Sequence, residues 1–188
     1  LRSGDLARLI EAGVSGLTSN PAIFEKAIAH GASYAQAVGE YKRQAIKPLQ
    51  IYEALATADI REACDMLAPV YESSRARDGY VSLEVNPHLA QDCAATLREA
   101  RRLFSEVGRP NVMTKIPGTE AALPAITRAI ADGVNINVTL IFSVERYKQV
   151  LDAWLSGLEE AAHDGSKSLA RIASVASFFI SRVDAAVD

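Results

Sequence analysis

The sequence has little of what marks the specialised classes of protein. Only two of its 188 residues are cysteines, Cys64 and Cys93, so no disulfide framework is possible and a cytoplasmic location is expected. Glycine (11 residues) and proline (7 residues) are too scarce for collagen-like or low-complexity architecture. No stretch approaches the roughly 20 consecutive apolar residues of a membrane helix, so we expect no membrane partner.

Signatures of charge, metal and nucleotide binding are also missing. The net charge of -3 gives no basic surface for nucleic acid, so no nucleic-acid partner is expected. His30, His88 and His163 are dispersed without metal-ligand spacing, and we expect no metal site. The chain has no GxGxxG, no GxxxxGK[ST] and no GxSxG motif, which disfavours dinucleotide, P-loop and serine-hydrolase chemistry.

What the sequence does contain is a regular alternation of helical and strand patterns. Hydrophobic residues make up 49% of the chain, which is typical of a globular domain. We predict strands at residues 80–85, 111–116, 135–141 and 171–180, and a short one at 16–20. Helical patterns separate them, with starts at Asn86-Pro87, Thr119 and Ser143 and a break near Pro48. This order predicts βα units with a parallel sheet, in a single domain over residues 1–188.

The three middle strands each have one apolar face. Side chains alternate along a strand, so residues of one parity should face the covering helices. These residues are Val81, Leu83, Val85, Val112, Thr114, Ile116, Ile136, Val138 and Leu140.

The other parity gathers polar residues near the ends of the same strands. Glu84, Lys115, Asn137 and Thr139 all fall on it. Both faces of a parallel sheet are buried, so polar groups here must satisfy one another or contact a ligand. Sheets of this kind, closed into barrels, place their chemistry at the C-terminal ends of the strands. We take these four residues as the candidate site.

The residue types at this site favour carbonyl chemistry. Burial disfavours the charged form of an amine, and a neutral lysine can attack a carbonyl carbon to form a Schiff base. A carboxylate moves protons directly or through a water that a hydroxyl such as Thr139 holds. Taken singly, Lys115 is more simply a surface residue and Glu84 a structural ion-pair partner. Their coincidence favours bond making and breaking beside a ketone, with neither metal nor organic cofactor.

Five segments resemble the transaldolase family, in its longer bacterial form. They are residues 16–24 (GLTSNPAIF), 81–85 (VSLEV), 112–119 (VMTKIPGT), 136–143 (INVTLIFS) and 174–182 (SVASFFISR). The resemblance implies a (β/α)8 TIM barrel of the class I aldolase type. It also implies transfer of a dihydroxyacetone unit from a ketose phosphate (sedoheptulose 7-phosphate or fructose 6-phosphate) to an aldose phosphate (glyceraldehyde 3-phosphate or erythrose 4-phosphate), as in the non-oxidative pentose phosphate pathway.

The resemblance also implies catalytic roles. Lys115 matches the Schiff-base lysine. Glu84 and Thr139 match the pair that holds a proton-relaying water while the carbinolamine forms and dehydrates. The protonated imine itself stabilises the carbanion, so the family requires no cofactor.

Four further positions match substrate-binding residues of the family. Asn20 and Asn137 match residues that bind the dihydroxyacetone hydroxyls, although Asn20 before Pro21 is most simply a turn residue. Ser177 and Arg182 match residues at the other end of the substrate, where Arg182 supplies charge for the phosphate.

The family pattern extends beyond both ends of this sequence. Its general acid/base aspartate would precede Leu1, and a second phosphate-binding arginine would follow Asp188. A barrel of this type takes about 250 residues, so we expect only about strands 2 to 6 here. The missing initiator methionine agrees with an incomplete chain.

Two other functions stay open from the sequence. One is a Schiff-base aldolase that releases dihydroxyacetone to water, and the other is an inactive barrel fragment that binds sugar phosphate or a partner protein. Either a monomer or a homodimer is compatible with the sequence.

Overall fold

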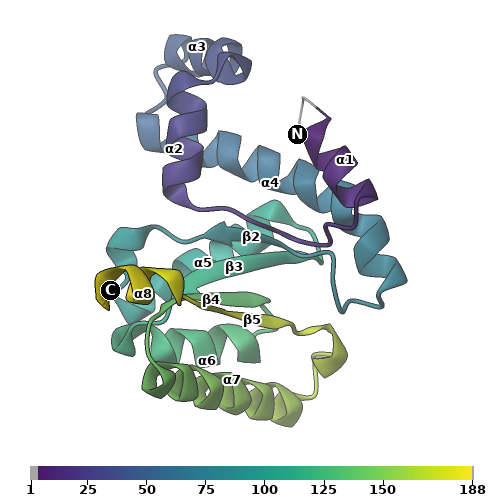
Figure 1. Cartoon of the computed structure of the whole chain (residues 1–188), viewed down its shortest axis with the longest axis vertical. Helices are drawn as coiled ribbons and strands as arrows, with labels where there is room; N and C mark the ends of the chain where they lie inside the picture. The colour runs from purple at the N-terminus through teal and green to yellow at the C-terminus, as the bar shows by residue number, and fades with distance from the viewer. Residues whose placement is uncertain (1–3, 188) are drawn as a thin grey trace. The chain divides into compact units, whose positions relative to one another are not determined.

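The computed structural model describes residues 4–187, and within them five strands alternate with helices (Figure 1). The strands β1 to β5 follow one another in the sheet in sequence order. Their bounds are β1 (Leu17–Thr18), β2 (Val81–Glu84), β3 (Val112–Pro117), β4 (Ile136–Ile141) and β5 (Ser174–Phe178). The α-helices are α1 (Asp5–Glu11), α2 (Pro21–His30), α3 (Ala35–Arg43), α4 (Pro48–Ser73), α5 (Cys93–Val107), α6 (Leu123–Ala131), α7 (Val144–Asp164) and α8 (Ser181–Val187). Short 3-10 helices are η1 (Ala32–Tyr34), η2 (Pro87–Leu89), η3 (Glu120–Ala122) and η4 (Leu169–Arg171).

The helix starts expected from the sequence are largely confirmed. Pro48 begins α4, and the Ser143 hydroxyl caps α7 by accepting from the Arg146 amide at 3.1 Å. Thr119 caps η3, which leads into α6. The predicted start of the long helix at Asn86-Pro87 was wrong, because Asn86 caps only the short helix η2. The long helix α5 begins at Cys93, where the Asp92 carboxylate accepts from the Ala95 amide.

The chain divides into two compact units, and the boundary between them crosses β2 and β3. The first unit comprises the chain up to Leu83 together with Glu106–Val112. There β1 pairs in parallel with β2, and the Asn111 side chain donates to the carbonyls of Cys64 and Gly79 at 2.9 and 2.8 Å. Cys64 lies in the buried face of α4, and burial raises the pKa of its thiol to about 12. The Cys64 thiol is therefore an inert core group.

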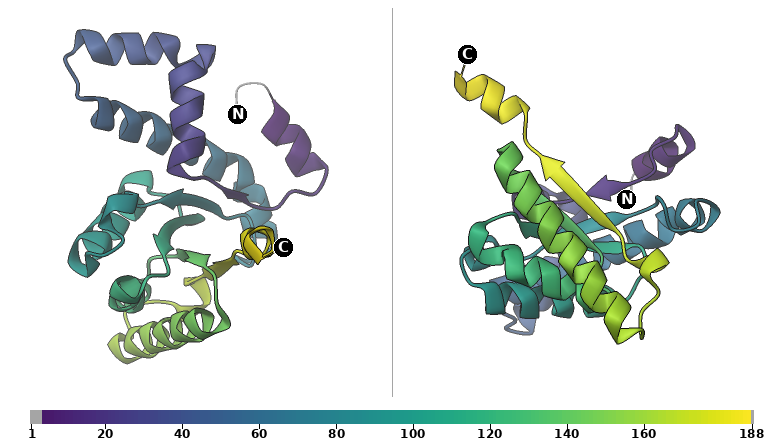
Figure 2. Two further views of the ribbon diagram at one scale, coloured as in Figure 1. Left: turned by 60° about the vertical axis from the view of Figure 1, so that its left-hand side comes forward. Right: turned by 90° about the horizontal axis from the view of Figure 1, so that it is seen from below.

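The second unit comprises Glu84–Ser105 and the chain from Met113 onward. In it β3, β4 and β5 pair in parallel. Helices α6 and α7 lie side by side and pack against β4. Figure 2 shows these two helices in green. The Thr114 hydroxyl donates to the Ala100 carbonyl of α5 at 3.2 Å. This contact confirms that the Thr114 parity of β3 faces the helices, so Lys115 faces the other way.

Strand β4 contains a bulge that the sequence did not reveal. Leu140 has a φ of 58°, and the pairing with β5 shifts register between Val138 and Ile141. Leu140 was expected to face the helices but is 38% exposed, whereas Ile141 is completely buried. One extra residue in a strand reverses the alternation of every side chain beyond it.

Helices α6 and α7 approach each other closely at Gly157. A Cβ atom added there would lie 2.6 Å from the Thr127 carbonyl oxygen and 2.7 Å from Cβ of Ile130. Only a residue without a side chain allows this approach.

We therefore expect Gly157→Ala to destabilise the protein. Overpacking costs about 1–3 kcal/mol and outweighs the roughly 1 kcal/mol that alanine gains over glycine in a helix. Thermal unfolding followed by circular dichroism should show a melting temperature lowered by a few degrees. The neighbouring exposed residue provides the control, since Ser156→Ala should leave the melting temperature unchanged or slightly raised. A stabilised Gly157→Ala variant would contradict the close approach.

Candidate active site

A buried ion pair lies at the centre of the candidate site. Nζ of Lys115 is 3.1 Å from Oε2 of Glu84, and the two side chains are only 9% and 10% exposed. Backbone pairing sets this distance, because the Val85 amide donates to the Lys115 carbonyl at 3.0 Å. Lys115 and Glu84, predicted separately from the parity of two strands, are thus in direct contact.

Asn137 lies beside Lys115 on the same face of the sheet. The two residues are partners in the register between β3 and β4. Ser177 on β5 donates its hydroxyl proton to Oδ1 of Asn137 at 2.8 Å, which fixes the orientation of the buried amide. Asn137 is the second residue of β4 rather than near its end, so register and not position along the strand places it beside Lys115.

Thr139 follows on the same face, opposite Pro117 of β3. Its side chain is 1% exposed, and its hydroxyl oxygen has no hydrogen-bond partner among the described residues. Burying a hydroxyl without a partner costs free energy, so this atom is suited to hold a small polar ligand such as water. Thr114 of β3 differs from Thr139, because its hydroxyl donates to the Ala100 carbonyl of α5.

Asn20 belongs to the first unit, and its observed contact is structural. It caps α2, with its side-chain oxygen accepting from the Ile23 amide at 2.9 Å. The structure thus shows Asn20 as a helix cap rather than a turn residue, and a substrate contact through this residue stays a prediction.

Arg182 makes its observed contact with an aromatic ring that the sequence patterns did not single out. Its guanidinium carbon lies 4.9 Å from the ring centroid of Phe179. Phe179 in turn meets Phe142, with centroids 5.4 Å apart. The FF pair that directly follows Ser177 was the available signal, and aromatic residues are common in strands.

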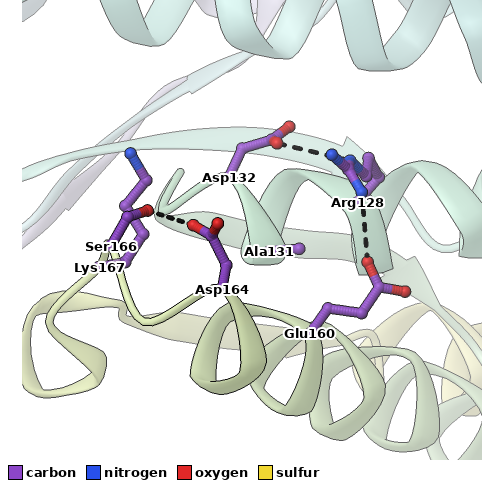
Figure 3. A pocket seen from close by; sticks show the side chains of 7 residues that line it. All are labelled: Arg128, Ala131, Asp132, Glu160, Asp164, Ser166 and Lys167. Carbon is purple, nitrogen blue, oxygen red and sulfur yellow. Dashed lines mark hydrogen bonds and ion pairs between the residues drawn. The ribbon is translucent and has the colours of Figure 1, made fainter.

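A separate polar pocket of about 450 Å³ lies in the same unit (Figure 3). It adjoins the loops that precede β4 and β5, which is the opposite end of the strands from the one where such folds place their chemistry. Arg128 binds both Asp132 and Glu160, and Ser166 donates to Asp164. Its charged groups largely satisfy one another, so we assign this pocket a structural role.

Comparison with known proteins adds to this geometry. The family model described as transaldolase/fructose-6-phosphate aldolase matches residues 2–188. The chain belongs to this family. It is 53% identical to "Transaldolase 2" of Nostoc sp. (strain PCC 7120) over the whole chain, and 54% identical to "Transaldolase" of Thermobifida fusca (strain YX).

The chain spans about half the length of these transaldolases, 49% and 51% respectively. Its five parallel strands with alternating helices are consistent with part of the (β/α) barrel of the transaldolase family. Within residues 4–187, no helix is long and apolar enough to cross a membrane. Over the same range, no group of three or more His, Cys, Asp or Glu residues could hold a metal ion.

The buried pair yields a stability prediction. Lys115→Met leaves the Glu84 carboxylate buried without its cation, which should lower the free energy of unfolding by about 3–5 kcal/mol. Adding Glu84→Gln removes the uncompensated charge and should recover part of that loss. Urea unfolding of the wild type, both single variants and the double variant measures the coupling. Additive losses in the double variant would show that the two side chains do not interact.

Proposed function

We propose that this protein acts as a transaldolase, transferring a dihydroxyacetone unit from a ketose phosphate to an aldose phosphate through a Schiff base on Lys115. The observation that carries the proposal is the buried lysine in contact with a carboxylate on the polar face of a transaldolase-family sheet. Surface lysines are solvated, whereas the Lys115 side chain is buried. Its enclosure supports a role as a nucleophile.

Glu84 provides the proton transfers that imine formation needs. At 3.1 Å it can accept a proton from the Lys115 ammonium, giving a neutral amine and a neutral carboxyl group. The amine then adds to the C2 carbonyl of the ketose. Glu84 returns the proton to the carbinolamine hydroxyl, which leaves as water and yields the imine.

Thr139 and Asn137 complete this part of the site. The unpartnered Thr139 hydroxyl is suited to hold the water that carries protons between Glu84 and the carbinolamine. Asn137, oriented by Ser177, presents its amide beside Lys115, where it can donate to a substrate hydroxyl. Asn20 is proposed to bind a second hydroxyl of the dihydroxyacetone unit.

Transfer of the C4 hydroxyl proton to a general base then breaks the C3–C4 bond, which releases the aldose phosphate as an aldehyde and leaves the electron pair as an enamine on Lys115. Delocalisation of the electron pair into the iminium nitrogen stabilises this intermediate, so the scheme requires no cofactor. Addition to an acceptor aldehyde and hydrolysis of the new imine complete the transfer. Arg182 is proposed to bind the substrate phosphate. We also propose that residues 1–188 form a single partial barrel domain, with a cytoplasmic location and a monomeric or homodimeric state.

Borohydride trapping tests the proposal. Incubation with fructose 6-phosphate and borohydride, followed by peptide mass mapping, should show a reduced adduct on Lys115 because borohydride reduces the imine irreversibly. Lys115→Met should give no adduct, and its circular dichroism spectrum controls for folding. A folded wild type without an adduct, or an adduct on another lysine, would refute the assignment. Product analysis with and without glyceraldehyde 3-phosphate separates transfer from simple aldolase release.

Thr139 gives a prediction in which stability and rate separate. Thr139→Val removes an unpartnered buried hydroxyl without changing the shape of the side chain, so stability should stay unchanged or rise by about 1 kcal/mol. The rate of adduct formation should fall roughly tenfold to hundredfold because the relay water loses its anchor.

Thr114→Val is the matched control for this variant. It removes a hydroxyl that bonds to the Ala100 carbonyl on the helix-facing side, so it should lose about 1–2 kcal/mol of stability. Its rate of adduct formation should equal that of the wild type. Equal rates for the two valine variants would remove Thr139 from the relay.

A further inference from the structure

Three side chains form a stack at the end of β4 and β5. The rings of Phe142 and Phe179 lie 5.4 Å apart at an interplanar angle of 33°, and the Arg182 guanidinium lies over Phe179. Phe142 comes from the segment after β4, whereas the other two residues come from the segment after β5. The stack therefore links two segments that are far apart in the sequence.

The bulge at Leu140 places Phe142 on the correct face for this contact. Beyond the bulge Ile141 returns to the side of Val138, since both side chains lie 3.3 Å from the position of a Cβ built at Gly118. Phe142, one residue further, then lies on the opposite face, the face of Thr139. Without the bulge, strict alternation would turn Phe142 toward the helices.

The partner ring lies on the same face for an independent reason. Phe179 follows Ser177 by two residues, and Ser177 contacts Asn137 on the site face. The Phe179 amide also donates to the Ile141 carbonyl at 2.8 Å, which fixes the backbones that carry the two rings. The contact between the rings thus follows from the bulge and from the pairing of β4 with β5.

We propose that Phe142 is a positioning residue that, through Phe179, holds the Arg182 guanidinium ready for the phosphate of the substrate. This inference rests on the proposed function, in which Arg182 binds that phosphate. An exposed arginine samples many rotamers, and a ligand must restrict them on binding. A guanidinium already held over a ring has lost much of that freedom, and its stacked face leaves the N–H groups at its edge free to donate to an anion.

The test compares ligands with and without a phosphate. Phe142→Leu removes the ring that supports Phe179, so the half-saturating concentration of fructose 6-phosphate in Lys115 trapping should rise about tenfold. The value for dihydroxyacetone, which lacks a phosphate, should change less than about twofold. The maximal trapping rate should not change, because the lysine and its carboxylate are untouched. Phe142→Tyr, which keeps the ring, should restore the affinity for the phosphorylated ligand.

Tyr147 provides the matched control. It is 40% exposed, against 46% for Phe142, and it pairs with the neighbouring Phe178 at a centroid distance of 6.4 Å. Tyr147→Leu therefore removes a similar aromatic contact beside the same strand without touching the stack. An equal effect in Tyr147→Leu, an equal effect on both ligands, or no effect of Phe142→Leu would overturn the proposal.

Equilibrium binding separates failure of this inference from failure of the proposed function. Calorimetric titration of fructose 6-phosphate and of fructose needs no covalent chemistry. A wild type that binds the phosphorylated sugar more tightly, with the difference lost in Phe142→Leu, supports the inference even if no Lys115 adduct forms and the proposed function fails. A wild type that binds both sugars equally overturns the inference even if dihydroxyacetone forms the adduct.

Discussion

The contact between Lys115 and Glu84 is the constraint on which the candidate site depends. Nζ of Lys115 and Oε2 of Glu84 are buried 3.1 Å apart, and burying either charge without the other would be costly. The register between β2 and β3, which carry them, is therefore tightly constrained. The pairing of β3 with β4 then sets Asn137 beside the lysine and Thr139 two residues further along. Replacing either charged residue with an apolar one would leave the helices in place. It would remove the ion pair around which the polar residues of the sheet are arranged.

The polar residues of this layer divide into those that are satisfied and one that is not. The Asn111 side chain donates to the carbonyls of Cys64 in α4 and of Gly79, and the Asn135 side-chain oxygen accepts from the Ala173 amide just before β5. Thr139 contrasts with them, because its hydroxyl is as deeply buried yet has no partner among the described residues. An unpaired buried hydroxyl in this layer requires an explanation, and the proposed relay water provides one.

Simple alternation along the strands was enough to predict which residues form the site face of β2, β3 and β4 up to Thr139. It failed at Leu140, because a bulge depends on how two strands pair and not on the composition of one of them. It also could not assign partners: the Asn20 cap on α2 and the Arg182 contact with Phe179 depend on local backbone geometry and on a second segment. Segments 112–119 and 136–143 were informative because they place unlike polar residues at matched strand positions, which packing alone does not explain.

The backbone at Leu140 has a consequence for how this sequence can change in evolution. An insertion or deletion in a strand with perfect alternation exchanges the faces of all later residues. At the bulge of β4 the outcome differs, because deleting Leu140 would restore simple alternation and leave Thr139, Ile141 and Phe142 on their present faces. The bulge is therefore the position in β4 where the loss of one residue changes the fewest side-chain orientations, and related sequences of different length in this strand should differ there.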